Sequence, residues 1–170
     1  MKKGFSLIEL LVVLSIISIL SSFSIYAVKQ LIEKAQLRNA IGSLSSSLIS
    51  AQSNSRASGL VTIICPSINS TRCDTASNWS HGWITYSDID GSYSLDKAEP
   101  IIAVKDNYPG YIAYTFNAPG NPQKIIFYRS GRLWPNGSFI ICHSKSREGS
   151  KIIMTQSGRV RTAAISTADC

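Results

Sequence analysis

Three features of the sequence predict an α+β protein, in which a long N-terminal helix packs on an antiparallel β-sheet domain. First, residues 5–28 form an apolar run with one charge, at Glu9. Second, apolar residues continue at helical spacing beyond this run, and the first proline is Pro66. Third, from Leu60 onward short β-branched segments alternate with clusters of Gly, Pro, Asn and Ser, which is typical of antiparallel strands.

The apolar run is long enough to cross a membrane. As a helix it would measure roughly 36 Å, and a hydrocarbon core is about 30 Å thick. Lys2 and Lys3 precede the run, so the positive-inside rule predicts a cytoplasmic N-terminus with the rest of the chain outside. The alternative is a secretory signal peptide cut after Ala27. The acid inside the run and the unbroken helical pattern after it favour a retained helix.

An amphipathic half of the same helix is predicted over residues 29–58, ending near Gly59. Its apolar stripe comprises Val28, Leu31, Ile32, Ala35, Ile41, Leu44, Leu48 and Ala51. Such a stripe needs a surface to cover it. We expect the β-rich domain, residues 59–170, to supply that surface.

Eight segments of this domain are predicted to contain strands: 60–65, 82–91, 100–104, 111–116, 124–128, 138–143, 151–156 and 160–165. Two of them begin the same pattern, I-I-x-x-x-S-G-R, at residues 125–132 and 152–159. Each copy is predicted to run strand, glycine turn, strand, with the glycine at positive φ. The two turns then present Arg132 and Arg159 at comparable places in a sheet.

The chain has four cysteines: Cys65, Cys73, Cys142 and Cys170. No two of them form a C-x-x-C pair, which argues against a zinc site. An even number in an exported domain predicts disulfides. Three pairings are possible, and free buried thiols are a further alternative. We favour Cys65–Cys73 with Cys142–Cys170, because the first closes a short loop and the second fastens the last residue.

Charge is distributed unevenly along the chain, whose net charge is +7. Residues 124–170 carry eight bases and two acids, whereas residues 70–110 carry three bases and six acids. This asymmetry predicts a basic face with an acidic partner, nucleic acid being the first candidate. On a strand, Arg159 and Arg161 would share one face about 6.6–6.8 Å apart, with Val160 toward the core. The alternative is a solvated basic surface.

Sequence motifs give no sign of an enzyme, a metal site or a cofactor. The two histidines, His81 and His143, are predicted to be surface or partly buried loop residues. The segment "DIDG" (88–91) starts like a calcium loop, with Glu99 twelfth from Asp88, but Gly91 is misplaced and a polar turn is favoured. Three tryptophans, Trp79, Trp83 and Trp134, could stack on bases but are predicted to pack in the core or at its rim.

The N-terminal segment, bases followed by "GFSLIELLVVLSIISIL", resembles the type IV prepilin signal. The resemblance implies that residues 1–4 are a leader removed by prepilin peptidase, which cuts between Gly4 and Phe5 and methylates Phe5. It also implies that Glu9 meets the N-terminal amine of a neighbouring subunit during assembly. A buried charge is tolerated when it is paired. The alternative is a Glu9 that stays hydrated near the membrane surface.

Downstream stretches resemble the FimT/GspH branch of minor pilins and pseudopilins: "IICPS", Cys73, "WSHGWITYSDIDG", "IIFYRSGRLWPNGSFIIC" and "SGRVR". The resemblance implies a pilin fold and an anchor in the bacterial inner membrane by residues 5–28, with a periplasmic globular domain. It also implies assembly with major and minor pilins into an extracellular pilus.

The segment "GRVR" (158–161) resembles the G-R-x-R signature of FimT-type pilins tied to DNA uptake. The resemblance therefore implies DNA capture for natural transformation. No base-reading helix is apparent in the sequence, so contacts with duplex DNA are expected to be with its backbone, without sequence preference. The alternative is a minor pseudopilin of a type II secretion system with protein partners only. The residues expected to contact DNA are Arg132, Lys145, Arg147, Lys151, Gly158, Arg159 and Arg161.

Overall fold

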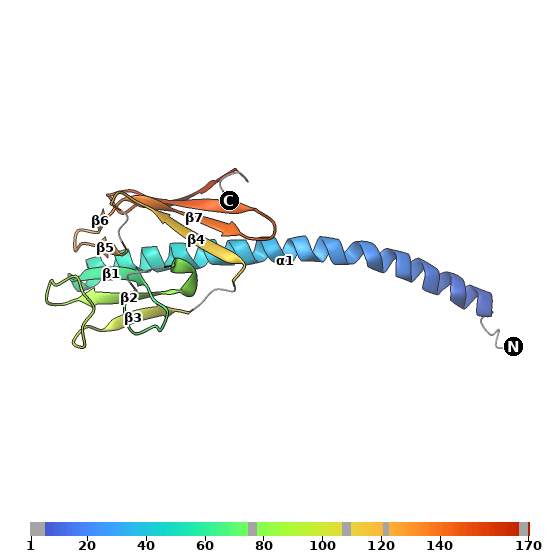
Figure 1. Ribbon diagram of the computed structural model, residues 1–170, viewed down its shortest axis with the longest axis horizontal. Coiled ribbons are helices and arrows are strands. Elements are labelled where there is room, and N and C mark those ends of the chain that lie inside the picture. The colour runs from blue at the N-terminus through green and yellow to red at the C-terminus, as the bar shows by residue number, and fades with distance from the viewer. Residues whose placement is uncertain (1–5, 75–77, 107–109, 121–122, 167–169) are drawn as a thin grey trace. The chain divides into compact units, whose positions relative to one another are not determined.

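The computed structural model describes residues 6–74, 78–106, 110–120, 123–166 and 170, without the side chains of residues 20–27. Within these ranges the chain forms a long helix, a 3-10 helix and strands in two antiparallel sheets (Figure 1), which confirms the predicted α+β class. The elements are α1 (Leu7–Ser58), β1 (Val61–Pro66), η1 (Trp79–His81), β2 (Trp83–Asp88), β3 (Ile101–Lys105), β4 (Ile112–Asn117), β5 (Ile125–Phe127), β6 (Leu133–Trp134), β7 (Gly137–His143), β8 (Gly149–Met154) and β9 (Val160–Ala164).

The chain divides into two packing units, one up to Gln36 and one from Leu37 to Cys170. In the first unit, described apolar side chains of α1 are exposed, from Leu7 at 78% to Ile19 at 59%. Among the described residues, no helix combines the length and apolar character needed to cross a membrane. The predicted span 5–28 extends beyond the described residues, because Phe5 and the side chains of 20–27 are outside them.

The second unit is built around the C-terminal half of α1. The buried stripe is Leu37, Ala40, Leu44, Leu48 and Ala51, at helical spacings of three and four. Of the predicted stripe, Val28, Leu31, Ile32 and Ala35 are instead exposed, and all four belong to the first unit. The helix ends as expected at Gly59, whose φ of +67° suits a glycine C-cap.

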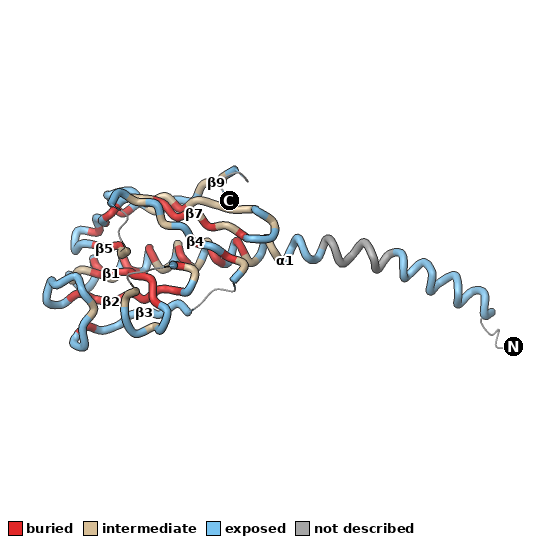
Figure 2. Tube along the Cα trace, viewed as in Figure 1, coloured by how far each residue is buried: buried red, intermediate tan, exposed pale blue. Residues whose placement is uncertain are grey.

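Both sheets contribute to the core that covers this stripe. One sheet has the order β3-β2-β1-β5-β6 and the other β4-β7-β8-β9. One core cluster contains Ile64 and Phe127 of the first sheet, Phe139 and Ile152 of the second, and Leu48 of the helix. Figure 2 shows buried residues running along this half of α1 and along the strands of both sheets. The prediction that the β domain covers the helix is therefore confirmed.

The tryptophans divide between core and surface. Trp79 and Trp83 are buried, and the Trp79 ring meets Phe139 edge-on with centroids 4.9 Å apart. Trp134 is 46% exposed at the end of β6. The prediction of core packing is therefore confirmed for Trp79 and Trp83, whereas Trp134 is exposed and belongs to neither core cluster.

Candidate nucleic-acid interface

The two S-G-R segments form turns with the same hydrogen bonds. In the first, the Gly131 N–H donates to the Tyr128 carbonyl (2.7 Å) and the Tyr128 N–H to the Arg132 carbonyl (2.8 Å). In the second, the Gly158 N–H donates to the Thr155 carbonyl (2.8 Å) and the Thr155 N–H to the Arg159 carbonyl (3.1 Å). Gly131 and Gly158 have φ of +78° and +86°, a region that other residues rarely adopt. The sequence repeat is therefore also a structural repeat.

These turns lie next to each other, although they belong to different sheets. The Leu133 N–H, just after the first turn, donates to the Gln156 carbonyl in the second (3.1 Å). Beneath them, the Gln52 side chain of α1 donates to the Gly131 carbonyl (2.7 Å). Arg132 and Arg159 are both exposed. The fold thus brings together two arginines that are 27 positions apart.

Arg159 and Arg161 lie on the exposed side of the second sheet. Arg159 precedes β9 rather than lying within it. Its carbonyl accepts the Thr155 N–H and so still belongs to the turn. Arg161 pairs with Ile153, and Val160 packs against the core, so the predicted alternation is confirmed for these two residues, while Arg159 lies outside the strand. Lys151 is two positions before Ile153, the partner of Arg161, and itself pairs with Ala163. Residues two apart on a strand point to the same face, so Lys151 shares the face of Arg161.

Lys145 and Arg147 belong to a different place. They lie in the loop between β7 and β8, at the opposite end of β8 from Arg159. A six-residue strand spans about 20 Å, so the structure separates these two bases from the paired turns. The residues expected to contact DNA therefore fall in two places, with Lys145 and Arg147 apart from the paired turns.

His143 also differs from its prediction. It is 1% exposed, at the end of β7, and its Nδ1 accepts the N–H groups of Lys145 and Ser146, both at 3.3 Å. The buried His143 ring thus satisfies two backbone N–H groups of the β7–β8 loop and holds this loop against the end of β7. The expectation of a surface or partly buried loop residue is wrong for His143, while His81 is exposed as expected.

The acidic half of the domain contains a carboxylate cluster. Asp88, Asp90 and Glu99 offer oxygen atoms within 4.8 Å of one another. Asp88 accepts the Gly91 N–H (2.8 Å), and Glu99 accepts the Ile89 N–H (3.2 Å). These carboxylates thus fold the segment after β2 back on itself, which agrees with the predicted polar turn. Burial and the neighbouring Asp88 raise the pKa of Glu99 above its ordinary 4.5.

Glu99→Gln should change the pH dependence of stability. A carboxyl whose pKa is raised by folding binds its proton more tightly when folded, so its contribution falls as pH rises from 4.5 through the raised value. The free energy of unfolding of the wild type, relative to Glu99→Gln, should therefore decrease over that window. Urea denaturation of both proteins at a series of pH values measures this difference, and a difference independent of pH would contradict it.

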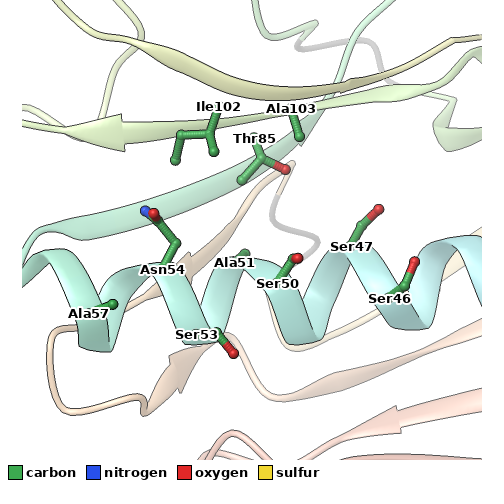
Figure 3. A pocket seen from close by; sticks show the side chains of 10 residues that line it. All are labelled: Ser46, Ser47, Ser50, Ala51, Ser53, Asn54, Ala57, Thr85, Ile102 and Ala103. Carbon is green, nitrogen blue, oxygen red and sulfur yellow. The ribbon is translucent and has the colours of Figure 1, made fainter.

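A groove of about 500 Å³ separates α1 from β2 and β3 (Figure 3). Its lining consists of uncharged and mostly small side chains: Ser46, Ser47, Ser50, Ala51, Ser53, Asn54, Ala57, Thr85, Ile102 and Ala103. None of these ten residues carries a cation that could bind a phosphate. The paired arginine turns are therefore the better candidate for an acidic partner.

The two disulfides join Cys65 to Cys73 and Cys142 to Cys170, with Cα–Cα distances of 5.5 and 5.6 Å. This is the favoured pairing, and it is confirmed. Glu9, the predicted assembly residue, lies exposed in the first turn of α1, where the helix dipole favours an acid. Gly4 and Phe5 lie outside the described residues.

Comparison with known proteins identifies the family. The family described as Type II transport protein GspH matches residues 40–159, and the prokaryotic N-terminal methylation motif matches residues 1–25. No curated protein sequence matches the chain.

Among solved structures, the type IV minor pilin FimU of Pseudomonas aeruginosa superimposes with a TM-score of 0.59 at 16% identity, covering 80% of this chain and 92% of FimU. The minor pseudopilin EpsH of the Vibrio cholerae type 2 secretion system gives 0.54 at 10% identity, covering 76% and 97%. These likenesses establish the shared fold. The chain belongs to the GspH family of type II transport proteins and carries the prokaryotic N-terminal methylation motif, on a fold that it shares with a type IV minor pilin and a minor pseudopilin.

Proposed function

We propose that this minor pilin binds double-stranded DNA without sequence preference and so serves DNA uptake in natural transformation. The observation that carries the proposal is the pair of adjacent S-G-R turns, which present Arg132 and Arg159 together with Arg161 on an exposed edge. Guanidinium groups bind phosphate oxygens through two parallel N–H bonds. Turn and strand residues of this kind contact the DNA backbone, which fixes position without reading bases.

Arg159→Gln combined with Arg161→Gln should weaken DNA binding on all sequences alike. Each lost phosphate contact lowers the magnitude of the slope of log affinity against log salt by about 0.9, so the double variant should lose about 1.8. The fold should persist, because both side chains are exposed. Fluorescence titration of labelled duplexes by the full chain in detergent measures affinity and slope, and transformation frequency should also fall.

The matched control is Lys29→Gln with Lys34→Gln, which removes the same charge from α1 before the globular unit begins. Its affinity and salt slope should stay close to those of the wild type. If the arginine variant and this control behave alike, the Arg159–Arg161 site is refuted.

The N-terminal segment is proposed to insert in the inner membrane with Lys2 and Lys3 on the cytoplasmic side, and to be cut by prepilin peptidase. The exposed apolar side chains from Leu7 to Ile19 support it, because such a surface needs lipid or neighbouring helices around it. Glu9 is then proposed to pair with the Phe5 amine of a neighbouring subunit, since an unpaired acid in lipid is costly.

Replacing Gly4 should leave an uncut precursor. The free Phe5 amine arises only on cleavage, so the variant should also fail to enter fibres. Intact-mass spectrometry of membrane extracts should find Phe5 at the wild-type N-terminus and Met1 on the Gly4 variant. A wild-type N-terminus near Val28 would contradict this processing.

A second candidate function is that of a minor pseudopilin in type II secretion, with protein partners only. The GspH family match and the likeness to EpsH favour it. Neither role requires a catalytic step. Absence of DNA binding at low salt, with secretion genes beside this gene, would decide for the pseudopilin.

A further inference from the structure

Besides their positive φ angles, Gly131 and Gly158 have no room for a side chain. A Cβ on Gly158 would collide with the Gln52 amide nitrogen and with the Gly131 carbonyl oxygen. A Cβ on Gly131 would collide with the guanidinium group of Arg56. The missing side chains therefore allow two turns and the last turns of α1 to come into direct contact.

Gln52 is the residue through which these three segments meet. It is half-buried on α1, donates to the Gly131 carbonyl at 2.7 Å and occupies the space beside Gly158. The turns are also joined directly by the Leu133–Gln156 hydrogen bond of 3.1 Å. Fixing Gln52 thus fixes both turns, and with them the starting points of Arg132 and Arg159.

Arg56 lies one helical turn beyond Gln52, in the last turn of α1. Its guanidinium group lies against Gly131, next in the chain to Arg132, and the residue as a whole remains exposed. A guanidinium group is planar and presents five N–H donors in a fork that matches phosphate geometry. The helix thereby places a third guanidinium group against the first turn, at the residue before Arg132.

We propose that Arg56 is a phosphate-contacting residue that completes one anion site with Arg132 and Arg159, and that Gln52 is the positioning residue of this site. The inference rests on the proposed DNA binding and extends it to the helix, which no sequence motif indicated. Three guanidinium groups from three segments would engage neighbouring phosphates of one duplex, each by backbone contact.

Arg56→Gln tests the contact, with the full chain in detergent titrated against a labelled duplex at several salt concentrations. We expect weaker binding and a salt slope smaller in magnitude by about 0.9. Arg56→Lys should restore the slope, because it restores the charge. Arg38→Gln is the matched control, an exposed arginine of the same helix more than four turns earlier, and it should leave the slope unchanged.

A wild-type slope in Arg56→Gln, while Arg159→Gln with Arg161→Gln still weakens binding, would overturn the role of Arg56 and leave the proposed function standing. No wild-type binding at low salt would overturn both. Urea denaturation of each variant checks that the chain is folded. A reduced salt slope in a folded variant can then be assigned to the lost contact between Arg56 and a phosphate.

Gln52→Met tests the positioning, because it keeps the length of the side chain and removes the donor. It should weaken DNA binding in the wild-type background and have little further effect when Arg132 and Arg159 are already Gln. Such non-additivity shows that Gln52 acts through the two arginines. Equal losses in both backgrounds would assign Gln52 to general stability and contradict its positioning role.

Discussion

Leu48→Ala should lower the free energy of unfolding by roughly 2–5 kcal/mol, the usual cost of removing a fully buried leucine side chain. Leu48 is 0% exposed and belongs to the core cluster that contains residues of α1 and of both sheets. The cavity would lie in a core built from α1 and strands of both sheets, and close-packed surroundings relax only partly around such a cavity. Urea denaturation of the full chain in detergent, followed by the fluorescence of buried Trp79 and Trp83, measures the loss.

Leu31→Ala is the control for this prediction. It is the same substitution on the same helix, but Leu31 is 67% exposed and precedes the globular unit. It should change the free energy of unfolding of that unit by no more than about 0.5 kcal/mol. Equal losses in the two variants would mean that the sheets are not held by the Leu37–Ala51 stripe.

Cys142→Ala with Cys170→Ala should cost about 3.6 kcal/mol on the chain-entropy account. The disulfide closes a loop of sequence separation 28 that contains β8 and β9. β9 is an edge strand, paired on one side by β8, so the bridge restrains the end of the chain beyond it. Removing the bridge should therefore loosen the strand that carries Arg161, and thermal or urea unfolding of the variant measures the effect.

Removal of the other bridge provides the comparison. Cys65–Cys73 has a sequence separation of 8, for which the same account gives about 2.5 kcal/mol. The variant lacking Cys142–Cys170 should thus be the less stable of the two. The reverse order would show that local packing at Cys65, which is 1% exposed, outweighs loop length.

Local signals were enough to predict most of the fold. The helix end at Gly59, the positive φ of Gly131 and Gly158, and the disulfide pairing all depend on residues within a short stretch or on a small set of alternatives. The repeated I-I-x-x-x-S-G-R pattern gave two turns with matching hydrogen bonds. The helix end and the glycine turns depend on local backbone conformation, and the disulfides are covalent bonds between cysteines. Both kinds of feature can be predicted from the residues at those positions.

Tertiary packing decided what the sequence could not. Periodicity alone assigned Leu31 and Leu48 to one stripe, yet only Leu48 is buried, because burial depends on where the sheets begin to touch the helix. Charge counting placed Arg147 with Arg159, and the length of β8 separates them. Gln52 carries no motif at all, and its position beneath both turns follows from the docking of two sheets on one helix.

The salt dependence of DNA binding by the wild-type chain tests the proposed function most directly. If Arg132, Arg159 and Arg161 each contact a phosphate, the slope of log affinity against log salt should be at least about 2.7 in magnitude. Duplexes of unrelated sequence should give the same affinity at each salt concentration. A slope near zero, a strong preference for one sequence, or no binding at low salt would contradict the assignment of these arginines to the DNA backbone.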